Sequence, residues 1–366
     1  FPEFSGEWET KSINDLADVI GGGTPDTTVK SYWDGGIQWF TPSEIGKNKF
    51  VDASLRTITE DGLNNSSAKL LPPNTILLSS RATIGECSLS LRECATNQGF
   101  QSLVSKKCNV DFLYYLIQTK KKDLIRKSCG STFLEISANE VRKIQVSVPS
   151  DVEQQKIAGL LSLIDKRIAT QNKIIEDLKL LKSAISLNVL HSDTWEQFKI
   201  KDIAQIGRGR VISSIEISQQ KNPTYPVYSS QTSNDGIMGY LDDYMFEGEY
   251  ISWTTDGANA GTVFYRNGKF NCTNVCGLLK LIKGFDTHFV SLVLAEATKK
   301  YVSINLANPK LMNNTMGNIQ ICLPKLEEQK RISIVFRVLQ RLWTVHNSLL
   351  TEYIKQKQYL LSQMFI

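Results

Sequence analysis

The feature that most constrains the fold of this chain is an internal repeat. The segment Pro149–Ile157 follows the pattern Pro-x-x-x-Glu-Gln-x-x-Ile, and it returns as Pro324–Ile332. The same offset, 324 − 149 = 175, also relates Ile144-Gln145 to Ile319-Gln320. A repeat of this length indicates two copies of one structural unit in one polypeptide. We therefore expect the copies to pack about a pseudo-twofold axis and to bind the same kind of ligand twice.

Each copy is predicted to close with a helix of about 40 residues, or about 60 Å. Ser150 and Glu153 have the spacing of a capping box at the start of the first helix. After each motif, apolar residues recur in steps of three and four, which is typical of a heptad seam. The seam consists of Ile157, Leu161, Ile164, Ile168, Ile175, Leu178 and Ile185, and of Ile332, Phe336, Leu339, Trp343, Leu350, Tyr353 and Leu360.

This seam has two candidate origins. One is packing of each helix against its own domain, which is the commoner origin of apolar stripes, and the other is pairing of the two helices as a coiled coil. The stripe is long and narrow, and its twin supplies a partner, so we favour the coiled coil. Polar residues interrupt the seam at equivalent places, Gln171 with His346 and Lys182 with Lys357, which would fix register. For the two lysines we expect a shared role, either a buried hydrogen bond across the coil or a partner contact.

The remaining sequence is predicted to form two mostly β domains, which makes the fold class α+β. Short β-branched and aromatic runs alternate with Gly, Asn and Asp, as in strands joined by tight turns. The clearest short helices are expected over Leu113–Lys127 and Phe289–Tyr301. Framework segments match between the halves, whereas the loop-rich segments differ. We predict domains at residues 1–148 and 192–323, and long helices at 149–191 and 324–366.

Composition narrows the class of protein only mildly. The net charge of +5 and pI of about 8.7 permit nucleic acid as a partner. The 7 Cys are scattered and only 3 His are present, so we expect reduced structural thiols rather than a metal site. Neither an apolar run of about 18 residues nor a signal peptide is visible, which favours a cytoplasmic protein. The chain begins at Phe1 without Met, which is compatible with missing upstream residues.

Searches for catalytic motifs favour a protein without chemistry of its own. The sequence contains neither a Gly-x-x-x-x-Gly-Lys-Ser/Thr loop nor a Gly-x-Ser-x-Gly elbow. Asn222–Tyr225 faintly resembles the Asn-Pro-Pro-Tyr loop of amino-methyltransferases, but Thr224 replaces the second Pro. A Gly-rich cofactor segment at a strand end is also missing. We therefore predict a binding protein.

The assembled pattern resembles the specificity subunit of type I restriction–modification enzymes. The doubled Pro-x-x-x-Glu-Gln-x-x-Ile motif carries this resemblance together with segments in both halves. These segments are Phe1–Glu9, Gly22–Pro25, Tyr32-Trp33, Gly36–Trp39, Leu77–Gly85 and Thr96–Gln98, then Tyr225–Ser229, Gly257–Gly261 and Thr273-Asn274.

The resemblance implies a fold and a role. Each variable region would be a target-recognition domain that reads one half of a split, asymmetric DNA sequence. The two long helices would pack as an antiparallel coiled coil that separates the domains and sets the spacing of the half-sites. Two methyltransferase subunits would attach, bringing S-adenosylmethionine and adenine-N6 methylation, and restriction subunits that use ATP and Mg²⁺ can join. The specificity subunit itself would hold no cofactor and no catalytic residue.

Candidate DNA contacts follow from side-chain chemistry. Lys and Arg neutralise phosphates, and forked or amide groups read base edges. Trp39 and Trp253 are expected in the cores. The candidates are Lys30, Tyr32, Trp33, Arg81 and Thr83 in the first domain, and Arg208, Arg210, Ser230, Gln231, Asn234, Thr254 and Asn259 in the second. The alternative function is a structural or adaptor protein whose β-rich lobes bind protein or glycan.

Overall fold

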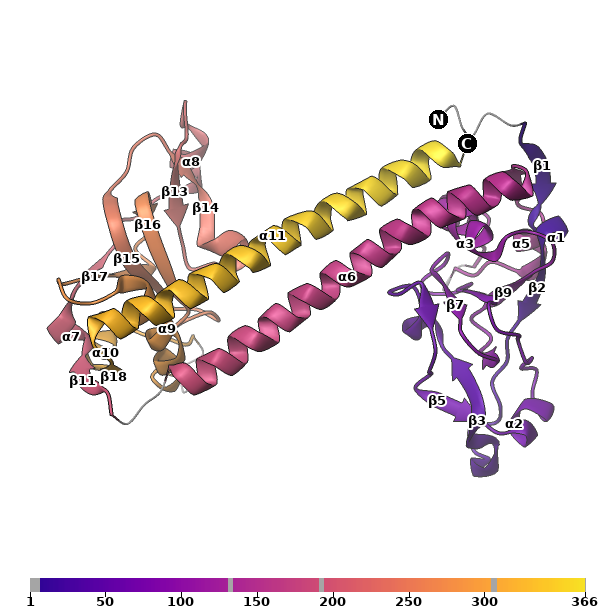
Figure 1. Cartoon of the computed structure of the whole chain (residues 1–366), viewed down its shortest axis with the longest axis horizontal. Helices are drawn as coiled ribbons and strands as arrows, with labels where there is room; N and C mark the ends of the chain where they lie inside the picture. The colour runs from indigo at the N-terminus through magenta and orange to yellow at the C-terminus, as the bar shows by residue number, and fades with distance from the viewer. Residues whose placement is uncertain (1–6, 131–133, 191–193, 304–307, 366) are drawn as a thin grey trace. The chain divides into compact units, whose positions relative to one another are not determined.

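The computed structural model describes residues 7–130, 134–190, 194–303 and 308–365. Its contacts divide the chain into two compact units. Unit 1 contains residues 1–173 and 347–366, and unit 2 contains residues 174–346. Each unit joins one β-rich lobe to a part of both long helices (Figure 1). The compact units therefore divide within the two long helices.

The lobe of unit 1, lobe 1, contains three small sheets. Their strand orders are β2-β9-β6-β7-β4, β5-β3-β8 and β1-β10. β3 pairs with β8 in parallel, and β4 pairs with β7 in parallel. The elements are β1 (Glu9–Ser12), α1 (Ile13–Leu16), β2 (Ala17–Gly21), η2 (Lys30–Tyr32), β3 (Trp33–Phe40), η3 (Pro42–Glu44), β4 (Phe50–Val51), β5 (Arg56–Ile58), α2 (Glu60–Asn64), β6 (Ile76–Leu78), β7 (Cys87–Ser90), β8 (Cys94–Thr96), β9 (Gln101–Ser105), α3 (Val110–Thr119), α4 (Lys121–Arg126), α5 (Ala138–Arg142) and β10 (Gln145–Val148).

The lobe of unit 2, lobe 2, is built on one larger sheet of order β12-β17-β15-β16-β13-β14, with β11 and β18 forming a separate ribbon. The long antiparallel pair of β15 and β16 lies at its centre. The elements are β11 (Glu196–Lys199), α7 (Ile200–Ile203), β12 (Ala204–Arg208), α8 (Ser214–Ser218), β13 (Tyr225–Tyr228), η4 (Ser233–Gly236), β14 (Ile237–Leu241), β15 (Phe246–Thr254), β16 (Val263–Cys272), β17 (Cys276–Leu281), α9 (Thr287–Ala297), η5 (Thr298–Lys300), α10 (Asn313–Asn318) and β18 (Gln320–Leu323).

Each half of the chain closes with a long helix, α6 (Asp151–Val189) and α11 (Leu326–Met364). Side-chain contacts show that the helices run antiparallel. Asp165 of α6 contacts Lys357 of α11 in unit 1, and Lys182 of α6 contacts Gln340 of α11 in unit 2. The later contact on α6 therefore meets the earlier residue on α11. The prediction of an α+β fold with two long paired helices is confirmed.

The apolar residues of the predicted seam pack into the lobe cores near the ends of the helices. All fourteen predicted seam residues are buried or half-buried. Ile157 and Leu161 belong to the core of lobe 1, as Ile332 and Phe336 belong to the core of lobe 2. The core of lobe 1 also receives the end of α11, through residues such as Leu360, and the core of lobe 2 receives the end of α6. Burial of these apolar residues attaches the start of one long helix and the end of the other to each lobe.

The short helices begin slightly before their predicted positions because polar residues cap them. The Asn109 side chain accepts a hydrogen bond from the Phe112 N–H, and α3 begins at Val110. The Asp286 side chain accepts one from the Phe289 N–H, and α9 begins at Thr287. Such caps satisfy N–H groups that the helix itself leaves unpaired.

Candidate nucleic-acid interface and helix joints

The doubled Pro-x-x-x-Glu-Gln motif builds a joint between lobe and helix. In unit 1 the Gln154 Oε1 accepts from the Asn109 N–H at 3.0 Å, while its Nε2 donates to the Pro149 carbonyl at 3.0 Å. Gln154 is 3% exposed. A single buried amide thus connects the first turn of α6 to the residue that caps α3. Buried polar groups require such partners, which explains why Gln fits this position.

The same joint is present in unit 2. The Gln329 Oε1 accepts from the Asp286 N–H at 3.0 Å, and its Nε2 donates to the Pro324 carbonyl at 2.8 Å. Here too the partner residue caps the neighbouring helix, α9. The sequence repeat therefore encodes a structural joint, and not a nucleic-acid contact.

Aromatic pairs accompany both joints. Trp8 meets Phe112 edge to face at 6.3 Å, and Trp195 meets Phe289 edge to face at 5.8 Å. Glu153, predicted to form a capping box with Ser150, accepts a hydrogen bond from the Trp8 indole N–H at 3.2 Å. This contact ties the tryptophan near the start of the chain to the first turn of α6.

The two seam lysines make equivalent contacts with different chemistry. Lys357 forms an ion pair with Asp165 at 2.8 Å, and both side chains are mostly buried, at 20% and 16% exposure. Lys182 donates to the Gln340 side-chain oxygen at 3.3 Å at an exposed position. The offset of the repeat carries Asp165 onto Gln340 and Lys182 onto Lys357, so the two pairs occupy the same place in the repeat. Both lysines therefore contact the other helix, but the buried hydrogen bond expected of them is not found at Lys182, whose contact with Gln340 is exposed.

The ion pair in unit 1 belongs to a larger polar cluster. The Tyr115 hydroxyl donates to Asp165, and Lys49 donates to both Tyr115 and Ser162. Burial, followed by the hydrogen bond to Asp165, raises the pKa of Tyr115, which keeps the hydroxyl protonated as a donor. These groups lie at a hollow of about 1080 Å³ between lobe 1 and the unit 1 parts of the helices.

Lobe 1 exposes some of the predicted DNA contacts and buries one. Lys30 and Thr83 are exposed, Tyr32 is half-buried, and Arg81 is half-buried in an ion pair with Glu135 at 2.8 Å. Trp33 is wrongly predicted as a contact, because it is only 7% exposed. Its ring packs edge to face on Trp39 at 5.2 Å, and its indole N–H donates to the Asp26 carbonyl.

Lobe 2 presents most of its predicted contacts at the surface. Arg208 and Arg210 are exposed, and Arg208 donates to the Asn313 side chain at 3.0 Å. Arg210 forms a forked ion pair with Glu216, which raises the pKa of Arg210 and holds the pKa of Glu216 below its usual value. A DNA phosphate would have to displace this carboxylate to bind Arg210.

The remaining predicted contacts of lobe 2 divide by exposure. Asn234 and Asn259 are exposed, and Ser230 and Gln231 are half-buried. Thr254 is wrongly predicted, because it is 1% exposed at the end of the central strand β15. Trp39 and Trp253 are buried, at 4% and 0% exposure, as predicted for core residues.

Two arginines of interest, Arg56 and Arg266, were not among the residues predicted from the sequence. Arg56 is exposed, and its guanidinium lies 3.5 Å from the ring centroid of the buried Trp33. Stacking on an aromatic ring holds an arginine in place while its outer edge still faces water. Arg266 of β16 is buried at 2% exposure. Arg56 depends on an aromatic partner from another strand, and Arg266 stacks on Tyr228 of β13 as well as on Phe264 of its own strand.

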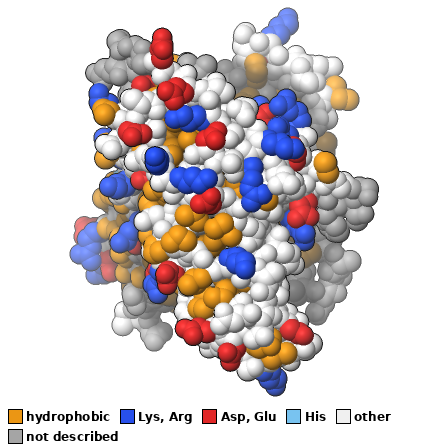
Figure 2. Space-filling view, turned by 90° about the vertical axis from the view of Figure 1, so that its right-hand side faces the viewer, with side chains coloured by type: hydrophobic (Ala, Val, Ile, Leu, Met, Phe, Trp, Pro, Cys, Tyr) orange, Lys and Arg blue, Asp and Glu red, His pale blue; other side chains and the backbone are white. Residues whose placement is uncertain are grey.

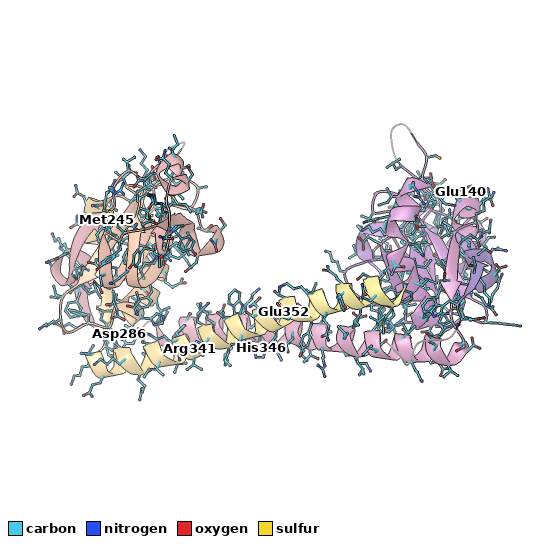
Figure 3. The ribbon with its side chains drawn as sticks, turned by 90° about the horizontal axis from the view of Figure 1, so that it is seen from above. Glu140, Met245, Asp286, Arg341, His346 and Glu352 are labelled. Carbon is cyan, nitrogen blue, oxygen red and sulfur yellow. The ribbon has the colours of Figure 1, made fainter. Side chains whose placement is uncertain are left out.

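Charged side chains of both signs lie on the face of lobe 1. The face in Figure 2 carries Lys and Arg side chains interspersed with Asp and Glu, and so is not a uniformly acidic face. In lobe 2, Asp286 lies beside α11, whereas Met245 lies at the side of the lobe away from that helix (Figure 3).

Within the residues that the structure describes, no His, Cys, Asp and Glu cluster could hold a metal ion, and no helix is long and apolar enough to cross a membrane.

Comparison with known proteins agrees with this architecture. The family model of the type I restriction modification DNA specificity domain matches twice, at residues 5–180 and 192–355. The chain therefore belongs to this family and contains two specificity domains. It is similar to the MjaIX specificity subunit of Methanocaldococcus jannaschii, with 39% identity over 48% of this chain and 42% of that protein. A putative type I specificity subunit of Mycoplasma pneumoniae is 37% identical over 57% of this chain and 79% of its own length.

The fold is shared with solved structures of low sequence identity. The S subunit of a type I restriction-modification system from M. genitalium superposes with a TM-score of 0.71 at 16% identity. The match covers 99% of this chain and 97% of that one. A chain from a structure of type I system assembly and conformational transition matches with a TM-score of 0.57 at 14% identity, covering 98% and 97% of the two chains. At these identities the likeness concerns the fold.

Proposed function

We propose that this chain is a non-catalytic specificity subunit whose two lobes read the two halves of a split, asymmetric site in double-stranded DNA. One observation carries the proposal: two identical joints support two different lobes. Gln154 and Gln329 make the same two hydrogen bonds to backbone groups, yet lobe 1 carries sheets of five and three strands while lobe 2 carries one sheet of six. A common scaffold with unequal loops is what two different half-sites require.

Affinity for DNA would come from basic side chains that neutralise phosphates. Exposed Lys30 and Arg56 of lobe 1 and exposed Arg208 of lobe 2 are candidates for this role, and Arg210 would join them if a phosphate displaced Glu216. Asn234, with an amide that suits adenine, is exposed in lobe 2. Reading would take place in the cytoplasm, where the DNA of the cell and incoming DNA are both accessible.

The catalytic partners would be two methyltransferase subunits, with restriction subunits joining in some complexes. S-adenosylmethionine, and ATP with Mg²⁺ where a restriction subunit joins, would be held by those partners. An exposed apolar stripe on α11 supports docking of a partner helix: Ile334, Val338, Leu342 and Val345 follow one another in steps of four, four and three. This spacing suits packing against another helix.

The function is tested by sequencing the methylated bases of a host that carries the methyltransferase gene with and without this chain. We expect one split motif to be methylated only when the chain is present. A third host should carry the chain with Val338→Asp and Leu342→Asp, which place charges on the apolar stripe, and a fourth should carry Ser348→Asp as the matched exposed control. An unaltered methylome without the chain would contradict the proposal.

The DNA contacts are tested separately by the salt dependence of binding. Replacing Arg56 with Ala should weaken binding to all sequences about equally and lower the salt slope by about 1 if Arg56 binds a phosphate. The adaptor alternative predicts that DNA affinity is indifferent to Arg56. Membership of the specificity-domain family does not favour that alternative.

A further inference from the structure

Lobe 2 contains an arginine whose charge is enclosed by the protein. Arg266 is 2% exposed, and its guanidinium lies 3.6 Å from the ring centroid of Tyr228 and 4.3 Å from that of Phe264. Its Nε donates to the Ser252 hydroxyl at 3.0 Å, and its Nη1 lies 3.2 Å from the Asp235 carboxylate. Burial of a charge is costly unless it is paired and hydrogen-bonded. Arg266 meets both conditions, through Asp235 and Ser252.

The acidic partner of Arg266 belongs to an unusual backbone segment. Residues Asn234, Asp235 and Gly236 have φ angles of +48°, +54° and +81°. Three consecutive residues in the left-handed region are costly where the residue is not glycine, and such strain persists only when surrounding contacts enforce it. Here the Arg266 guanidinium contacts the segment at two places. Its Nη1 lies beside the Asp235 carboxylate, and its Nη2 lies 3.0 Å from the position that a Cβ on Gly236 would occupy.

Further hydrogen bonds close the segment on itself. The Ser229 N–H donates to the Gly236 carbonyl at 2.9 Å, and the side-chain amides of Gln231 and Asn234 donate to the Ile237 carbonyl. The tip nevertheless faces solvent, because Asn234 is exposed and the Asp235 side chain is 73% exposed. The segment is therefore a rigid, amide-bearing loop that is anchored from below by a buried charge.

We propose that Arg266 is a positioning residue that fixes segment 229–237 as a base-reading loop of lobe 2. The inference rests on the proposed function, because it assigns the loop to one half of the DNA site. Burial prevents Arg266 from reaching DNA itself. Its effect passes through the loop, whose Gln and Asn side chains are of the type that recognises adenine. A fixed loop discriminates bases better than a mobile one, because the required geometry is already in place before binding.

The test uses the full chain assembled with its methyltransferase subunits, and duplexes in which each base pair of the split site is replaced in turn. Arg266→Lys keeps the charge but loses the planar fork and the stacking. Asp235→Asn leaves the buried arginine and its stacking intact, and it covers the case in which Arg266→Lys fails to fold. Lys269→Gln, an exposed change on the same strand β16, is the matched control.

We expect Arg266→Lys to lower discrimination by about tenfold at one or two base pairs of a single half-site, since one base contact is worth about this much. Asp235→Asn should lower it at the same base pairs by a smaller factor, and discrimination at the other half-site should stay unchanged. Lys269→Gln should at most weaken all duplexes equally. Unchanged discrimination in both loop variants, or only the uniform weakening of the control, would overturn the inference. A wild-type complex that methylates no split motif would instead refute the proposed function.

Discussion

Units 1 and 2 share their joints and differ in nearly everything the joints support. The two hydrogen bonds that Gln154 makes with backbone groups measure 3.0 and 3.0 Å, and the equivalent bonds of Gln329 measure 3.0 and 2.8 Å. The polar contact of the helix pair, by contrast, is a mostly buried ion pair in unit 1 and an exposed lysine–amide contact in unit 2. The comparison indicates that both units require the joint, whereas the seam tolerates different chemistry.

Substitutions in the two joints should cause the largest losses of stability, and the losses should be about equal in the two units. Gln154→Met and Gln329→Met retain much of the side-chain volume but leave a part-buried N–H and a buried carbonyl unpaired in each unit. We expect each variant to lose about 2–4 kcal/mol of stability, since each unpaired buried group costs about 1–3 kcal/mol. Urea unfolding measures the total, and hydrogen exchange in the first turns of α6 and α11 localises the loss to one unit.

The matched controls for the joints are Gln155→Met and Lys330→Met, which change exposed neighbours on the same turns. Both controls should keep wild-type stability within about 0.5 kcal/mol. If one glutamine could be replaced without loss while the other could not, the two joints would not be equivalent, and the basis of the comparison would be wrong.

Replacing the two seam lysines should have different effects on stability in the two units. Lys357→Met leaves Asp165 mostly buried without its cation, although Tyr115 still donates to it. We expect a loss of about 1–3 kcal/mol, less than for a completely buried pair because both groups keep some solvent. Lys182→Met, at the exposed equivalent, should change stability little. Thermal unfolding of the two single variants and the double variant provides the measurement, and equal effects of the two lysines would contradict the assigned asymmetry.

The seam and the joints show how far sequence alone reaches. The repeat and the heptad spacing predicted the long helices, and all fourteen residues of the predicted seam are buried or half-buried, because local periodicity sets which face of a helix is buried. The same repeat could not show that Gln154 binds the backbone N–H of Asn109, which is distant in sequence. Trp33 and Thr254 failed as DNA contacts because strand alternation in irregular lobes does not reveal which side faces the core. Arg56 and Arg266 were missed because Trp33 and Tyr228, on which they stack, lie on other strands.

A pH titration should distinguish the units next. His288 of unit 2 has its pKa lowered to about 4, first by burial and then by the charge of Arg337. The unfolded chain, with a histidine pKa near 6.5, binds the proton more readily, so stability is lost as pH falls from about 6.5 to about 4. After allowance for the partial exposure of the ring, we expect a loss of about 1–2 kcal/mol in unit 2.

The measurement is the unfolding free energy at several pH values, with hydrogen exchange in α9 to report on unit 2. His288→Asn retains a polar side chain near Ser333, whose hydroxyl lies 2.8 Å from the histidine Nδ1. This variant should flatten the dependence between pH 6.5 and 4 specifically in unit 2. A wild-type slope in the variant would mean that other groups cause the loss.

The smallest expected effect comes from making unit 2 resemble unit 1. Gln340→Glu places a carboxylate opposite Lys182 and so recreates, at the surface, the charge pattern of Asp165 and Lys357. We expect a gain of only about 0.2–0.5 kcal/mol, because an exposed ion pair is weakened by water and by the entropy of two long side chains. The gain should disappear at high salt and in the Gln340→Glu, Lys182→Met double variant, which a double-mutant cycle of thermal unfolding would show. A gain as large as the loss caused by Lys357→Met would mean that charge alone sets the strength of the contact. The expected small gain would instead assign the difference between the units to burial. The same pair of charges would then stabilise the helices strongly only where lobe 1 and Tyr115 exclude water from the ion pair.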